Sequence, residues 1–127
     1  MNIMFWKKEK PKEKKQIREE TKTLLKTECE KSNRPDLYQY LQYVPYFPDK
    51  WKKGQETSYF HSGCLTLYEG LRLEAQNNPE AIEKFEKAKQ ELGESRQKEP
   101  IYARDAEEII KNFDDVIKIL RRLWKID

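Results

Sequence analysis

The sequence predicts an all-α protein, and three observations lead to that prediction. Apolar residues recur at intervals of three and four in several long segments, which places them on one face of a helix. Charged residues make up 39% of the 127-residue chain, a share that favours solvated amphipathic helices. Aromatic residues, at 12%, are too frequent for a disordered chain. We therefore expect a small bundle of four main helices, at about residues 12–32, 55–77, 79–92 and 101–125.

Length and charge predict one folded domain with a distinct N-terminus. A chain of 127 residues can bury one core but is short for two. Residues 1–18 hold seven Lys/Arg and two Glu, a net charge of +5, whereas the other 109 residues hold 19 Lys/Arg and 21 Asp/Glu, a net charge of −2. We expect residues 1–11 to form a basic, partly flexible tail with an apolar tip. Residues 12–127 are expected to form the helical domain.

The first helix has a thin apolar face, so we expect it to lie on the surface of the bundle. Ser32 and Asn33, just before Pro35, are expected to end it. The apolar face comprises Ile17, Leu24, Leu25 and Cys29.

An aromatic segment follows the first helix. Residues 36–44 have apolar side chains at helical spacing and predict a short helix, with a strand over Tyr38–Val44 as the alternative because tyrosines alternate with polar residues there. Pro45 and Pro48 are expected to prevent regular structure, which would leave residues 45–51 as an aromatic loop across the core.

Two helices are predicted to meet at residues 77–79, Asn-Asn-Pro. The asparagines tolerate the left-handed backbone that ends a helix, and Pro79 suits the first turn of the next. Gly63 and Gly70 lie seven residues apart on the first of these helices and predict a close helix crossing. Gly93 is expected to end the second helix, with residues 94–99 as a linker. The apolar faces comprise Phe60, Cys64, Leu67, Leu71 and Ala75, and then Ala81, Ile82, Phe85, Ala88 and Leu92.

The second of these helices, residues 79–92, resembles the second helix of a tetratricopeptide unit. Ala81, Phe85 and Ala88 stand at the spacing that this repeat family uses for Ala, Phe and Ala. The resemblance covers half a unit, the preceding helix is longer than the usual one, and no second copy follows at a 34-residue interval. It implies a packed helix pair and a peptide-binding role.

The last helix has the most regular apolar face in the chain, so one side of it should be buried. Acidic residues near its start and basic residues at its end suit the helix dipole. The face comprises Ala106, Ile109, Ile110, Phe113, Val116, Ile117, Leu120, Leu123 and Trp124.

No residue pattern in the chain predicts catalysis, a metal site or a cofactor. The single histidine, His61, has no carboxylate three or four residues further along its helix, so we interpret it as a packing or surface residue. Cys29 and Cys64 lie on different predicted helices and are expected to be reduced, with a disulfide between them as the alternative. No apolar run approaches the roughly 18 residues of a membrane span. We therefore expect a cytoplasmic protein that is not an enzyme.

The aromatic segment is the first candidate for binding. Tyr, Trp and Phe dominate the energetics of protein interfaces, but they also fill the cores of small bundles. One hypothesis is that an aromatic anchor with a basic rim binds another protein or a second copy of the chain. The second is that the segment closes the core, and the third is that its rings stack on single-stranded nucleic acid. The residues concerned are Tyr46, Phe47 and Trp51, with Lys50, Lys52 and Lys53.

The N-terminus is the second candidate. An apolar tip beside a lysine cluster is typical of contact with an anionic membrane surface, and lysines also attract the phosphates of nucleic acids. The residues concerned are Phe5, Trp6, Lys7, Lys8, Lys10, Lys12, Lys14 and Lys15. The sequence thus favours a non-enzymatic interaction module, an accessory or adaptor protein. The alternative is a nucleic-acid-associated or membrane-surface protein.

Overall fold

The computed structural model describes residues 14–50, 54 and 56–126, and every regular element in these ranges is a helix. The all-α prediction is therefore confirmed, and the alternative of a strand over Tyr38–Val44 is wrong. The longer helices are α2 (Lys14–Lys31), α4 (Tyr43–Lys50), α5 (Tyr59–Ala75), α6 (Ala81–Lys98), α7 (Ala103–Lys111) and α8 (Phe113–Ile126). A 3₁₀ turn, η1 (Pro35–Leu37), and the short helix α3 (Tyr38–Leu41) connect α2 to α4. Each of the described helices is too short or too polar to cross a membrane.

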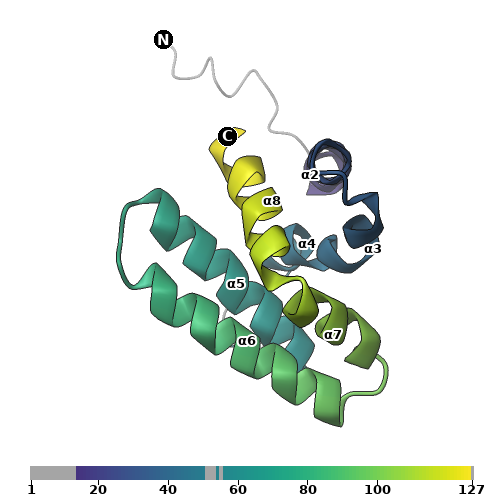
Figure 1. Cartoon of the computed structure of the whole chain (residues 1–127), viewed down its shortest axis with the longest axis vertical. Coiled ribbons are helices and arrows are strands. Elements are labelled where there is room, and N and C mark those ends of the chain that lie inside the picture. Colours follow the sequence, from purple (N-terminus) through teal and green to yellow (C-terminus); the bar gives the residue numbers. More distant parts are fainter. Residues whose placement is uncertain (1–13, 51–53, 55, 127) are drawn as a thin grey trace.

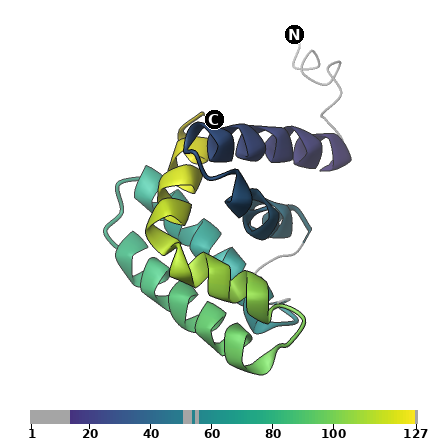
Figure 2. The ribbon, with the colours of Figure 1, turned by 45° about the vertical axis from the view of Figure 1, so that its right-hand side comes forward.

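The helices are arranged around an antiparallel hairpin of α5 and α6 (Figure 1). The chain returns through α7, which packs on α6, and then through α8, which packs on both α5 and α2. Figure 2 shows α2 on the side of the molecule opposite α6, with α4 between α2 and α5. The pairing of α5 with α6 confirms the two helices predicted to meet at residues 77–79.

Asparagines in the left-handed conformation end both α2 and α5, as their sequences predict. Asn77 has φ 58°, which lets its own amide bond to Glu74 O and the next amide bond to Leu73 O. Asn33 has φ 60° and the same pair of hydrogen bonds closes the end of α2. These bonds satisfy carbonyl groups that a helix end otherwise leaves without a donor.

The predicted close crossing of α5 on α6 is also found. A Cβ atom at Gly63 would lie 2.9 Å from the side chain of Leu92, and one at Gly70 would lie 2.7 Å from the ring of Phe85. Both distances are shorter than carbon atoms can approach, so the two helices need glycine at these positions.

The predicted irregular loop at residues 45–51 is wrong as far as Lys50, because α4 is a helix that contains both prolines. Pro45 lies in its first turn, where an amide has no partner within the helix. Pro48 lies further inside and removes one hydrogen bond. Burial of Val44 and Phe47 on the inner face of α4 compensates for that loss.

Two further helix boundaries differ from the prediction. Gly93 does not end α6, which continues to Lys98 because Leu92 and Ser95 are both buried and the turn packs against α7. The predicted single helix over 101–125 is divided at Asn112, whose backbone leaves the helical region. The Asn112 side-chain amide donates to Glu108 O at 2.8 Å, so a side chain competes for a carbonyl group at the point of the break. The division at Asn112 and the helix α4 are why the count of four main helices was too low.

The core forms where the predicted apolar faces meet. Phe60, Cys64, Leu67 and Leu71 on α5 are buried, and so is most of the predicted face of the C-terminal segment. The prediction missed Ile119, which is fully buried, and wrongly included Ile82, which is 68% exposed. Cys29 and Cys64 are buried free thiols in this structure, and the reduced state in solution stays a prediction.

Candidate functional site

The structure places two members of the predicted aromatic site in or near the core. Phe47 is only 8% exposed, and its ring centroid lies 4.5 Å from that of His61 and 6.3 Å from that of Phe60. Tyr46 is partly buried, with its ring 5.8 Å from that of Phe47. Phe47 is thus covered by α5 and is not presented to solvent. Lys50 is the last residue of α4, and its side chain, Trp51, Lys52 and Lys53 lie outside the described part of the chain.

The predicted anionic-surface segment also falls largely outside the described residues. Lys14 and Lys15 begin α2, and their side chains are not described. Phe5, Trp6, Lys7, Lys8, Lys10 and Lys12 precede the first described residue. The binding role of this segment stays a prediction.

His61 is a buried packing residue, which is one of the two interpretations that its sequence context allowed. Its side chain is 2% exposed, and its Nδ1 accepts a hydrogen bond from the Thr57 amide at 3.2 Å. Within the described ranges, no group of three or more His, Cys, Asp or Glu side chains could hold a metal ion.

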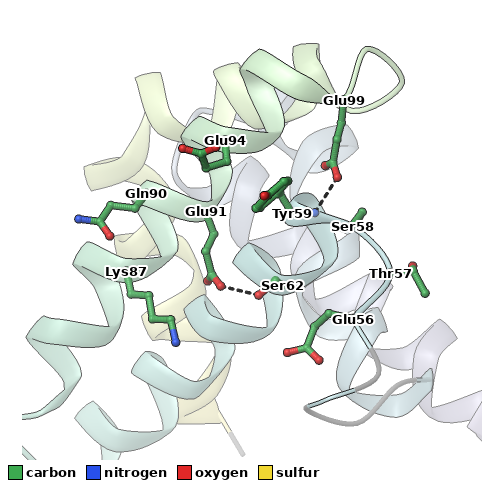
Figure 3. A pocket seen from close by; sticks show the side chains of 10 residues that line it. All are labelled: Glu56, Thr57, Ser58, Tyr59, Ser62, Lys87, Gln90, Glu91, Glu94 and Glu99. Atoms are coloured by element: carbon green, nitrogen blue, oxygen red, sulfur yellow. Dashed lines mark hydrogen bonds between the residues drawn. The ribbon is translucent and has the colours of Figure 1, made fainter.

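An open groove of about 620 Å³ lies between the start of α5 and the C-terminal half of α6 (Figure 3). We call it the α5–α6 groove. One wall is the segment that leads into α5 together with the start of that helix as far as Ser62, and the other is the face of α6 that carries Lys87, Gln90, Glu91 and Glu94. The lining residues are Glu56, Thr57, Ser58, Tyr59, Ser62, Lys87, Gln90, Glu91, Glu94 and Glu99.

Two side chains cap α5 at one end of the groove. Ser58 has extended backbone angles and its Oγ accepts a hydrogen bond from the His61 amide at 2.9 Å. The Glu99 carboxylate, just beyond the end of α6, accepts from the amides of Tyr59 at 2.7 Å and Phe60 at 3.0 Å. A negative charge at a helix N-terminus is favourable, so Glu99 holds the two walls of the groove together.

Glu91 lies in the middle of the groove and is only partly satisfied. The Ser62 hydroxyl donates to its Oε2, an interaction drawn in Figure 3. Its other oxygen, Oε1, is shielded from solvent and has no hydrogen-bond donor among the described residues. A shielded carboxylate oxygen without a donor is unfavourable, so the Ser62 hydroxyl is the main polar contact of this side chain within the described residues.

An aromatic ring and an ion pair line the far side of the groove. Tyr59 is 42% exposed, and the Lys98 ammonium lies 5.4 Å from the centre of its ring. Lys98 also contacts Glu94 at 2.8 Å, and this hydrogen bond raises the pKa of the Lys98 ammonium above its ordinary value. The Tyr59 face therefore already accommodates a cation.

The formal charge of the lining favours a basic ligand. Four glutamates and one lysine give the α5–α6 groove a charge of −3. A second hollow, of about 360 Å³ at the α7–α8 break, has two lysines and two aspartates and is balanced. One of those aspartates, Asp115, is already paired with Arg34 at 2.5 Å. The excess of acidic residues in its lining thus distinguishes the α5–α6 groove from this second hollow.

The sequence analysis missed this groove. Lys87, Glu91 and Glu94 are spaced by four and three, which places them on one face of a helix, but such spacings are common in a chain with 23 acidic residues. Their partners Ser62 and Tyr59 come from about 30 residues earlier, so only the packing of α5 on α6 brings the set together.

Comparison with known proteins does not place the chain in a family. Neither a protein-family model nor a curated protein sequence matches it, and no solved structure does.

Proposed function

We propose that this protein is a non-enzymatic interaction module that binds a lysine- or arginine-bearing segment of another protein in the α5–α6 groove. The observation that carries the proposal is the acidic lining of the groove, in which four glutamates and one lysine give a net charge of −3. An ammonium or guanidinium group would supply the complementary charge and hydrogen-bond donors for these carboxylates.

The surroundings of Glu91 support a peptide ligand over a free cation. The groove is open to solvent and its lining comes from both helices, so side chains of a bound segment can contact either wall. The exposed ring of Tyr59 offers an apolar surface for the methylene groups of a lysine or arginine side chain. Ser58 and Glu99 fix the first turn of α5, which keeps the wall in place without a partner.

The same charge argues against phosphate-bearing ligands at this site. Glutamates repel nucleic acids and anionic lipid surfaces, so any binding of those ligands belongs to the lysines at residues 7–15. The groove and the N-terminus are therefore separate candidate surfaces with opposite preferences.

The proposal is tested by titrating the isotope-labelled protein with a hexalysine peptide and following amide chemical shifts. We expect shifts to concentrate at Tyr59, Ser62 and Glu91 and to weaken with salt, because the contacts are exposed ion pairs. A hexaglutamate peptide serves as the ligand control and should cause no saturable shift. The expected dissociation constant is in the range of about 0.1–1 mM at low ionic strength.

A matched pair of variants shows whether Glu91 is the receiving group. Glu91→Gln keeps the side-chain shape but removes the charge, and it should weaken hexalysine binding about five- to tenfold. Glu86→Gln makes the same change at an exposed α6 position outside the groove and should leave binding within about twofold of the parent. Equal effects of the two variants, or shifts spread evenly over the surface, would show that hexalysine responds only to the overall charge.

A further inference from the structure

We propose that His61 makes the α5–α6 groove sensitive to pH: the neutral imidazole holds one wall of the groove in place, and protonation of the ring releases it. This inference rests on the proposed function, because it names a regulation of the same site. The device is an exchange of two hydrogen bonds between the first turn of α5 and the segment that leads into it.

The two bonds form on either side of the Ser58 cap. The His61 amide donates to Ser58 Oγ at 2.9 Å, and the Thr57 amide donates to His61 Nδ1 at 3.2 Å. Helices often begin with such an exchange, in which a Glu or Gln three residues after the cap accepts the returning bond. Here a histidine stands at that position, and its bond reaches the residue before the cap. An acceptor that titrates near neutral pH thus replaces the usual one.

Only the neutral imidazole can accept the returning bond. A neutral ring has one acceptor nitrogen, whereas both nitrogens of an imidazolium are donors. Protonation at Nδ1 would therefore turn two donors, this nitrogen and the Thr57 amide, toward each other. An unperturbed histidine has a pKa of about 6.5, so its protonation falls within the physiological pH range.

The position of the ring also disfavours a positive charge. His61 is 2% exposed, and its ring centroid lies 4.5 Å from that of Phe47 on α4. A charge excluded from water beside an aromatic ring loses hydration. The ring belongs to the first turn of α5, where the helix dipole is positive and repels a cation.

The charged groups near this turn are mainly carboxylates that other donors already engage. Glu99 accepts from two amides of α5, Glu91 accepts from the Ser62 hydroxyl, and Glu56 accepts from the Gly54 amide. An imidazolium therefore gains a carboxylate partner only if the turn rearranges. The titratable side chains around this turn, in the described part of the chain, are Tyr43 and Tyr46 of α4, Glu56 before α5, Glu91 and Lys98 of α6, and Glu99 and Tyr102 after it.

Release of the returning bond changes the groove because residues 56–58 form part of its wall (Figure 3). The released ring binds a proton and the buried ring does not, so the held form dominates above the pKa of the exposed ring and is lost as pH falls. With a pKa of about 6.5 for the exposed ring, the ratio of released to held wall rises about tenfold between pH 7.5 and pH 5.5.

The first test follows the returning bond in the unaltered protein by amide hydrogen exchange. The protection factor of the Thr57 amide should fall about tenfold between pH 7.5 and pH 5.5, because this amide is the donor to His61 Nδ1. The amide chemical shifts of α8 should stay in place, which shows that the fold persists. Unchanged protection at Thr57, or loss of the α8 signals over the same pH range, overturns the proposal.

Two variants at position 61 assign the pH response to the imidazole. His61→Gln keeps a side-chain acceptor that does not titrate and restores the usual residue for this exchange. Protection at Thr57 should then agree within about twofold at the two pH values. His61→Leu has no acceptor, so protection at Thr57 should already be low at pH 7.5. A tenfold pH response that persists in His61→Gln would assign it to other groups and contradict the proposal.

The closing experiment measures hexalysine binding at pH 7.5 and pH 5.5. The parent should bind two- to tenfold more weakly at pH 5.5, and His61→Gln should bind within about twofold at both, because ordinary glutamates stay ionised in this range. Equal binding by the parent at both pH values overturns this inference and leaves the proposed function standing. Absence of binding at both overturns the proposed function, and the Thr57 protection factor then decides by itself whether His61 controls the wall.

Discussion

At Gly63 the missing side chain is a packing requirement. The side chain of Leu92, which is fully buried, occupies the position that a Cβ atom of residue 63 would need, and the Leu92 amide nitrogen lies 3.3 Å from it. Gly93, by contrast, lies inside α6 with nothing within 4 Å of a built Cβ. Apart from proline, glycine has the lowest helix propensity of the amino acids, so a glycine inside a helix destabilises it. At Gly63 the close packing of Leu92 requires this loss of stability, whereas at Gly93 nothing in the packing requires it.

Alanine at these two positions should have opposite effects. Gly63→Ala should lower the free energy of unfolding by about 1–2 kcal/mol, because overpacking against Leu92 exceeds the gain in helix propensity. Gly93→Ala should raise it by about 0.5–1 kcal/mol. Urea denaturation followed by circular dichroism measures both. A stabilised Gly63→Ala protein would mean that α5 and α6 do not cross closely there.

The two thiols should be unreactive in the folded protein. Burial raises the pKa of Cys29 to about 11, with the carboxylates of Asp36, Glu28 and Glu30 adding to the effect. Burial also raises the pKa of Cys64 above the ordinary thiol value. Because the thiolate is the reactive form, a disulfide reagent at pH 8 should modify the native protein at least about 100-fold more slowly than the denatured protein. Rapid modification of either cysteine without denaturant would contradict its burial.

At the scale of elements, two ion pairs join α8 to its neighbours, one with a carboxylate shielded from solvent and one exposed. Arg122 contacts Glu28 of α2 at 3.0 Å, and the Glu28 side chain is only 5% exposed. Arg121, the preceding residue, contacts Glu74 of α5 with two hydrogen bonds at 2.9 and 2.7 Å, and the side chains of both partners are at least one-third exposed. Adjacent residues of one helix thus contact opposite sides of the bundle.

Replacing these arginines singly by methionine should separate a shielded pair from an exposed one. Arg122→Met leaves the Glu28 carboxylate shielded without its main partner and should cost about 2 kcal/mol, reduced from the fully buried case because Arg122 is 39% exposed. Arg121→Met should cost no more than about 1 kcal/mol, because water solvates Glu74 when the pair is lost. Chemical denaturation of the two variants gives the comparison. A larger effect at Arg121 would reverse this assignment.

At the scale of the whole molecule, an aromatic cluster connects segments that are distant in the sequence. The Phe60 ring of α5 stacks on that of Tyr102 before α7 at 4.8 Å, with 6° between their planes. It also meets the edge of Tyr43 from α4 at 5.1 Å. Phe47 of α4 contacts the same ring. This cluster binds α4 to the α5–α6 hairpin, which is why the proline-containing α4 can be stable.

Phe47→Ala should therefore destabilise the fold and should not act as a binding variant. Loss of a buried aromatic side chain should cost about 3–5 kcal/mol and lower the melting temperature by about 10–20 °C. Tyr46→Ala, one residue earlier and only partly buried, provides the control and should lower it less than half as much. An unchanged melting temperature for Phe47→Ala would restore the hypothesis that its ring is available to a partner.

Much of the helical structure could be predicted because its causes are local. The period of apolar residues on α5 and α8 depends only on which face can be buried, and the left-handed turns at Asn33 and Asn77 depend on the residue at that position. Boundaries failed where distant contacts outweighed local preference. Helix formation at Pro48 and continuation through Gly93 depend on packing against other elements. At the break, Arg34 donates to Asn112 Oδ1 at 3.0 Å, a contact between residues 78 positions apart that adds to the local bond with Glu108 O.

The sequence by itself determined the all-α class, the hairpin of α5 and α6, their close crossing at glycine and the separation of a basic N-terminus from a nearly neutral body. Each of these follows from short-range periodicity, turn chemistry or a sum of charges. Only the tertiary structure decided that Phe47 is covered and that Glu91, Ser62 and Tyr59 share one groove. The physical reason is that a groove is made by two walls, and the register of α5 on α6 is set by side-chain packing between residues about 30 positions apart.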